Sequence, residues 1–108
     1  MFVYLFAGPV KVSSVSINHK SNSTLTLEWA HVKAEEYNIE WTCSSPNTDE
    51  NKVFNQSVPD NTTESEVLDP GSFCTIVITA FVNNFDHGVL YGSATSLNES
   101  TLEEGLLI

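Results

Sequence analysis

The sequence predicts an all-β fold, an antiparallel sandwich of seven strands around one core. Several short segments alternate apolar and polar residues at period two, which is typical of strands with one buried face. Turn residues separate these segments at spacings of roughly 8 to 12 residues, as in known sandwiches. A chain of 108 residues, 41% of them hydrophobic, has room for one domain and one core. No segment shows a helical period over a useful length.

The first five predicted strands differ in how clearly they alternate. The first lies around residues 12–17, where uneven spacing of the apolar residues predicts a bulge or irregular pairing. The second, at 24–29, and the third, at 37–43, alternate cleanly and each contains a tryptophan. A weaker fourth strand is expected at 53–58, and a short fifth strand at 62–67 leads into a turn.

The corner before the sixth strand has the most distinctive local sequence in the chain. Leu68 is followed by Pro70, which presets φ, and by Gly71, which accepts a positive φ. Residues 73–82 then form a long strand, and residues 89–96 form the last one. The face of the long strand that we expect to be buried carries Cys74, Ile76, Ile78 and Ala80. The large core residues are expected to be Trp29, Tyr37, Ile39, Trp41, Leu68, Ile76 and Ile78.

The charge balance excludes one class of partner. Fourteen acidic residues stand against 4 lysines, with no arginine, for a formal net charge of -10. Nucleic-acid binding requires Lys and Arg to neutralise phosphate, so we expect no nucleic-acid partner. The acidic excess suits either a positively charged protein partner or simple solubility. Because the acids are scattered and form no long run, solubility is the favoured reading.

No catalytic, metal-binding or cofactor-binding pattern is present in the sequence. His19, His31 and His87 fall in separate predicted loops, and Asp86 with His87 would supply too few ligands for a metal site. There is no glycine-rich phosphate loop and no nucleophile elbow. We therefore expect a protein that is not an enzyme and needs no cofactor.

The chain ends are expected to lie outside the domain. The apolar run at residues 2–7 is too short to cross a membrane, which takes about 20 residues. Residues 1–9 are therefore interpreted as a leader remnant, an artificial extension or an extra edge strand, and no membrane insertion is expected. Residues 10–97 form the predicted domain, and residues 98–108 are interpreted as a tail or linker.

Cysteines and glycosylation sequons point to the compartment. The two cysteines, Cys43 and Cys74, are too far apart in sequence for a paired metal-ligand motif. Four Asn-x-Ser/Thr sequons are present, at Asn22, Asn55, Asn61 and Asn98. Together these features favour an extracellular location.

Three segments within residues 10–97 resemble a fibronectin type III domain, an immunoglobulin-like β-sandwich. They are Leu27-Glu28-Trp29, Tyr37-Asn38-Ile39-Glu40-Trp41 and Leu68-Asp69-Pro70-Gly71-Ser72. The amino-acid sequence of the last segment, together with the sequons, is similar to repeats from receptor-type tyrosine phosphatase ectodomains. The chain departs from the pattern twice. Cys74 stands where the family usually has a corner tyrosine, and Ala30 and His31 stand where it usually has a proline.

The resemblance implies a role for the two cysteines. In this fold the third and sixth strands are antiparallel neighbours. If Ile39 lies opposite Ile78, then Cys43 lies opposite Cys74 on the inward side. A disulfide there would offset the missing tyrosine, and two buried free thiols acting as small apolar residues are the alternative.

The resemblance also implies a function. We expect a non-catalytic extracellular module of a cell-surface receptor that serves as a spacer and protein-interaction domain. Its expected partners are other proteins and the neighbouring domains of the same receptor. The resemblance does not specify an oligomeric state. One alternative is a soluble or adhesion protein that binds a specific protein through its loops, with Phe85, Asp86 and His87 as the candidate loop. The other is an intracellular module, for which free thiols and unused sequons are expected.

Overall fold

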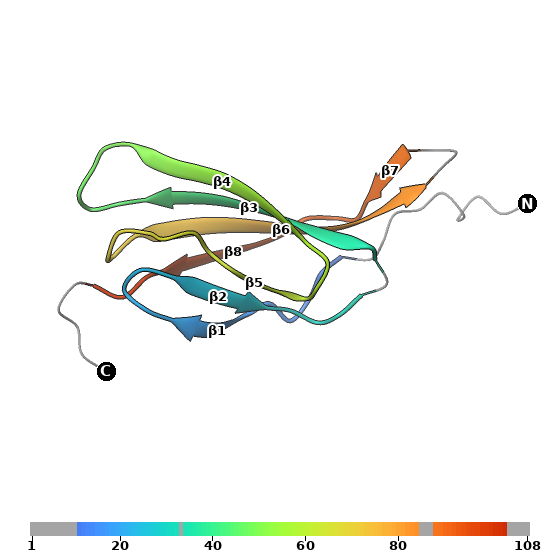
Figure 1. The fold of residues 1–108 in the computed structure, drawn as a ribbon, viewed down its shortest axis with the longest axis horizontal. Coiled ribbons are helices and arrows are strands. Elements are labelled where there is room, and N and C mark those ends of the chain that lie inside the picture. The colour runs from blue at the N-terminus through green and yellow to red at the C-terminus, as the bar shows by residue number, and fades with distance from the viewer. Residues whose placement is uncertain (1–10, 33, 85–87, 104–108) are drawn as a thin grey trace, which may run out of the picture.

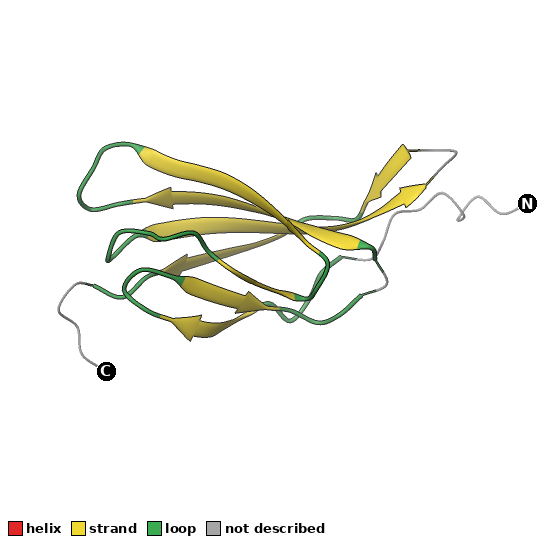
Figure 2. Ribbon diagram, in the orientation of Figure 1, coloured by secondary structure: helices red, strands yellow, loops and turns green. Residues whose placement is uncertain are grey.

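The computed structural model describes residues 11–32, 34–84 and 88–103, and within these ranges it contains strands and loops but no helix (Figure 2). No helix in the described ranges has the length and apolarity that crossing a membrane requires. The strands are β1 (Ser16–Lys20), β2 (Leu25–Glu28), β3 (Glu36–Ser44), β4 (Asn51–Val58), β5 (Thr62–Glu64), β6 (Phe73–Asn84), β7 (Gly88–Tyr91) and β8 (Thr95–Ser100).

The strands form two antiparallel sheets packed face to face (Figure 1). Sheet A has the order β1-β2-β5. Sheet B has the order β4-β3-β6, and both β7 and β8 pair with β6 on its other side. The predicted all-β sandwich is therefore confirmed.

The predicted seventh strand is divided into β7 and β8. Phe81 pairs with Tyr91, and Ile78 pairs with Thr95, so the later strand has one residue more than β6 between these two pairs. This extra residue makes a bulge, at which Gly92 donates its N–H to the carbonyl of Ala80 at 2.9 Å. The β6–β7 hairpin consequently projects from one end of the sandwich (Figure 1).

The core lies where the two inner faces meet, and it contains the expected residues. All seven large side chains predicted to be buried are between 0% and 5% exposed. Val12, Leu25 and Leu27 complete it from sheet A and the segment before it. Trp41 also stacks on Phe54 of β4, with ring centroids 5.4 Å apart.

Polar side chains join the two sheets along both open sides of the sandwich. On one side Gln56 of β4 accepts from Trp41 Nε1 and donates to the carbonyl of Glu64 in β5, each at 2.7 Å. On the other side Lys20 of β1 forms an ion pair with Glu99 of β8 at 2.7 Å. These contacts satisfy a buried indole N–H and hold the sheet edges in register.

The ends of the domain differ from the expected boundaries. The first strand begins at Ser16, with the expected irregularity between Ile17 and His19. The last strand continues to Ser100, and Thr101 is only 4% exposed, so the expected boundary at residue 97 falls inside a strand. Residues 1–9 lie outside the described part of the chain.

Candidate functional site: the disulfide-linked corner

The corner between β5 and β6 has the expected backbone. Gly71 has a φ of 73°, a conformation that side chains with a Cβ rarely adopt. Leu68 is 5% exposed, and its N–H donates to the carbonyl of Ser23 at 2.7 Å. The corner is thereby fixed to the β1–β2 turn of sheet A.

A disulfide joins β3 to β6 just past this corner. Ile39 pairs with Ile78, and Cys43 pairs with Cys74, as the family resemblance implied. The two cysteine Cα atoms are 4.0 Å apart, and Cys43 and Cys74 form a disulfide. Both residues are buried, so the bond lies inside the core rather than on the surface.

The hydroxyl groups of Ser72 and Thr101 bind the backbone of the corner, near the position where the family usually has a tyrosine. The carbonyl of Asp69 accepts from Ser72 Oγ at 2.7 Å and from Thr101 Oγ1 at 3.0 Å. Thr101 Oγ1 also accepts from the N–H of Ser72 at 2.9 Å. Sequence reasoning missed Thr101, since only the path of the chain beyond β8 brings it to the corner.

A cavity of about 120 Å³ lies beside the disulfide. Two of the polar side chains that line it already have partners: Lys52 Nζ donates to the Val67 carbonyl at 2.9 Å, and Ser45 Oγ donates to Asp69 Oδ2 at 2.7 Å. Small-molecule sites usually have about 300–1,000 Å³, so this cavity is small for one. A second cavity of about 320 Å³, lined by Pro46, Asn47, Pro70, Gly71 and Glu103, also borders the corner. The hydrogen bonds described above make the corner a structural joint.

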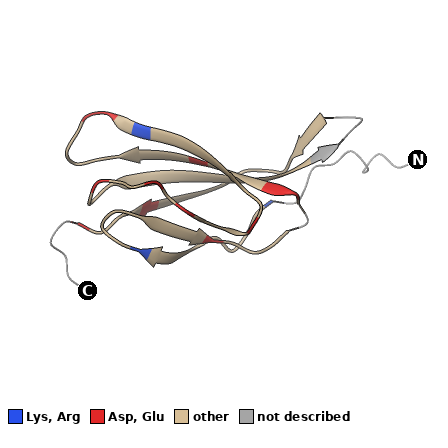
Figure 3. Ribbon diagram, in the orientation of Figure 1, with Lys and Arg blue, Asp and Glu red and all other residues tan. Residues whose placement is uncertain are grey.

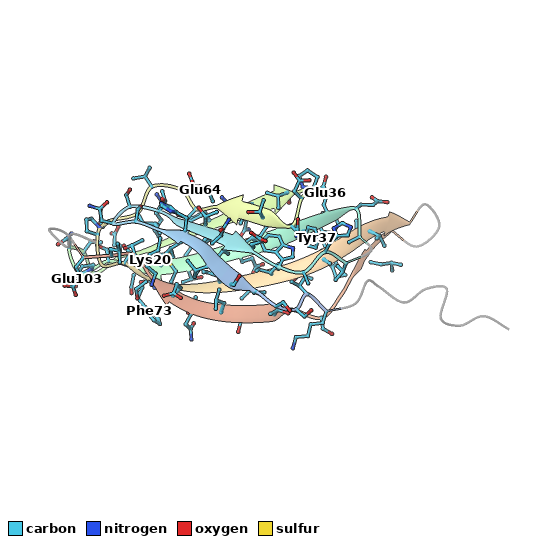
Figure 4. The ribbon with its side chains drawn as sticks, turned by 90° about the horizontal axis from the view of Figure 1, so that it is seen from below. Lys20, Glu36, Tyr37, Glu64, Phe73 and Glu103 are labelled. Atoms are coloured by element: carbon cyan, nitrogen blue, oxygen red, sulfur yellow. A yellow bond between two sulfur atoms is a disulfide. The ribbon has the colours of Figure 1, made fainter. Side chains whose placement is uncertain are left out.

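A second set of hydrogen bonds forms around Tyr37. Figure 4 shows Tyr37 toward one end of the sandwich and Phe73 and Glu103 toward the other. The Tyr37 hydroxyl accepts from the N–H of Val32 at 3.1 Å and donates to its carbonyl at 3.2 Å. This closes the β2–β3 connection onto β3. Nearby, the N–H of Ala30 donates to the Ser13 carbonyl at 3.0 Å. A proline at position 30 could not make that bond.

The four sequon asparagines occupy different environments. Asn22 lies in the β1–β2 turn, Asn55 in β4 and Asn98 in β8, and all three are exposed. Asn61 is half-buried, and its Nδ2 donates to the carbonyl of Trp29 at 2.7 Å.

The other candidate residues do not converge in the described structure. His19 and His31 are exposed and lie on different segments, and Phe85, Asp86 and His87 lie outside the described residues. Within the described ranges no three His, Cys, Asp or Glu side chains are grouped as a metal site requires.

Three solved structures show what the fold is similar to. The fn3 domain of the human collagen alpha-1(XX) chain has a TM-score of 0.70 and 17% identity, over 94% of this chain and 89% of that one. The FN5 domain of Drosophila Lar has a TM-score of 0.64 and 17% identity, over 87% and 97%. The chicken CNTN1 FN1-FN3 structure has a TM-score of 0.64 and 23% identity, over 89% of this chain and 33% of that longer one.

No family model and no curated protein matches the sequence. The structural neighbours nevertheless agree with one another in both architecture and coverage. This chain has the fold of a fibronectin type III domain.

Proposed function

We propose that this chain is a non-catalytic extracellular fibronectin type III module, a spacer and protein-interaction domain of a cell-surface receptor. The observation that carries the proposal is the buried Cys43–Cys74 disulfide. Structural disulfides persist in oxidising compartments and are rare in the cytosol. The fold is one that typically serves as an extracellular module.

The path of the chain supports a spacer role. The described chain enters the sandwich on the side nearer the β6–β7 hairpin and leaves past the corner at the other end (Figure 1). At the exit, Leu102 donates its N–H to the Ser21 carbonyl and accepts from the N–H of Gly71, both at 2.9 Å. An exit held in this way would transmit orientation to a following domain.

The finer assignment is to a receptor-type tyrosine phosphatase ectodomain. It is supported by the resemblance of the corner Leu68–Ser72, together with the sequons. The absence of arginine from the sequence argues against a phosphatase catalytic segment, so the module would serve binding and spacing.

The test is to express the chain behind a secretion signal in a glycosylating host and to measure its non-reducing intact mass after thiol labelling. We expect a secreted protein with glycan mass and no labelled thiol. Two labelled thiols on an unglycosylated chain would leave only the fold assignment. Binding to a protein by the isolated domain, lost in Phe85→Ala, would favour the adhesion alternative over the spacer.

A further inference from the structure

Two of the four sequons, distant in sequence, lie on one face of the folded domain. Asn55 of β4 pairs with Glu40 and Asn98 of β8 pairs with Thr75, and all four side chains are exposed. They project from sheet B away from the core. With β3 and β6 between them, the two asparagines are separated by three strand spacings across the sheet, about 14 Å, and by two residues along it, about 7 Å.

The amide of Asn98 is oriented for modification. Thr75 Oγ1 donates to Asn98 Oδ1 at 3.0 Å, which occupies the acceptor oxygen. N-linked glycans are attached through the other amide atom, Nδ2, which this hydrogen bond leaves available. The cross-strand contact therefore presents the nitrogen of an exposed side chain to solvent.

Asn61 is built in the opposite way. Its side-chain Nδ2 donates to the Trp29 carbonyl, and its main-chain carbonyl accepts from the Trp29 N–H at 3.1 Å. This pair of bonds extends the pairing of β2 and β5 by one step. One of the two hydrogens on Asn61 Nδ2 is held by the Trp29 carbonyl, so a sugar would have to replace the other one, on a half-buried side chain at the end of β2.

The face between Asn55 and Asn98 carries few charges for a strongly acidic protein, with Glu40 of β3 as its exposed charge opposite Asn55. The outward residues of β6 carry no charge, and β6 has no charged residue along its length (Figure 3). Val53 is 66% exposed and Phe73 is 49% exposed. Phe73 pairs with Ser100, so it is a diagonal neighbour of Asn98, within reach of a group attached there.

We propose that the outer face of sheet B is covered by carbohydrate: N-linked glycans on Asn98 and Asn55, with the first sugar on Asn98 lying against Phe73. Asn61 stays unmodified, as a hydrogen-bond donor that closes sheet A. The proposal rests on the extracellular location proposed above. It leaves the outer face of sheet A, and the loops other than the β1–β2 turn that carries Asn22, as the surfaces open to a protein partner.

The first measurement is site occupancy on the secreted domain, obtained by enzymatic deglycosylation in ¹⁸O-water followed by peptide mass spectrometry. We expect the isotope label at Asn98 and Asn55 and none at Asn61. Label at Asn61 in protein that unfolds cooperatively, or unmodified Asn98, would overturn the assignment.

The second measurement tests coverage by hydroxyl-radical footprinting of the secreted protein and of an Asn55→Gln/Asn98→Gln variant. Oxidation of Phe73 should rise in the variant. Tyr91 is the internal control, since it pairs with Phe81, about 26 Å along β6 from Phe73, and its oxidation should stay unchanged. Equal oxidation of Phe73 in both proteins would contradict coverage.

The two proposals fail in different ways. A secreted chain with a closed disulfide and an unmodified Asn98 would contradict only the glycan assignment. A chain that is retained in the cell with free thiols and no glycan would contradict the proposed function, and the glycan assignment with it.

Discussion

At the scale of single residues, the corner before β6 depends on the Thr101 hydroxyl. Thr101→Val removes both of its hydrogen bonds and leaves the buried N–H of Ser72 with only its longer bond, at 3.2 Å, to the Asp69 carbonyl. The free energy of unfolding should fall by about 1–3 kcal/mol, measured by urea denaturation. Thr75→Val is the matched control, because that hydroxyl is exposed, and a change within about 0.5 kcal/mol is expected. Equal effects of the two substitutions would contradict this role for Thr101.

A second residue-scale prediction concerns pH. The pKa of Glu99 is lowered, first by the hydrogen bond from Lys20 and then by the N–H of Ser100, while burial opposes both. A carboxyl with a lowered folded-state pKa adds stability above its unfolded value, roughly 4.3, and loses it as pH falls through the folded value. Glu99→Gln should therefore reduce the unfolding free energy at about pH 7, by roughly 0.5–1 kcal/mol since both side chains are partly exposed, and much less at about pH 3.

The control for this experiment is Glu66→Gln. The Lys52–Glu66 pair spans 3.3 Å, and its side chains are 46% and 51% exposed, so a smaller effect is expected. A Glu99→Gln difference that is the same at both pH values would show that the ion pair is not its source.

At the scale of elements, the β2–β3 connection depends on Tyr37. Tyr37→Phe keeps the ring, which packs edge-on against Trp29, but leaves the N–H of Val32 buried without its partner. A loss of about 1–3 kcal/mol in unfolding free energy is expected, together with faster amide hydrogen exchange at Val32. Tyr91→Phe, at a tyrosine that is 60% exposed, should change neither quantity. Slow exchange at Val32 in Tyr37→Phe would mean that the connection closes without the hydroxyl.

The strands themselves were predictable to different degrees. Alternation identified β2, β3 and β6, because each has one fully buried face whose residue types the core selects. The division of the last strand into β7 and β8 was not predictable. It depends on where the chain regains register with β6, and a one-residue bulge leaves no compositional signal.

At the scale of the whole molecule, the disulfide joins the two central strands of sheet B, at residues that are 31 positions apart in sequence. Reduction, or a Cys43→Ala/Cys74→Ala variant, should lower the unfolding free energy by about 3–4 kcal/mol through the greater entropy of the unfolded chain. Denaturation with and without reductant measures the effect. Equal thermal midpoints for the oxidised and reduced protein would rule out a stabilising role.

The sequence by itself determined the sandwich, its core residues and the corner, because each follows from local periodicity or from the backbone preferences of Pro70 and Gly71. It also led, through the family resemblance, to the pairing of Cys43 with Cys74. Only the tertiary structure decided which distant hydroxyl completes the corner, that Asn61 is a hydrogen-bond donor, and that Asn55 and Asn98 share a face. These depend on contacts between strands far apart in sequence, whose geometry is set by how the two sheets pack and not by any local preference.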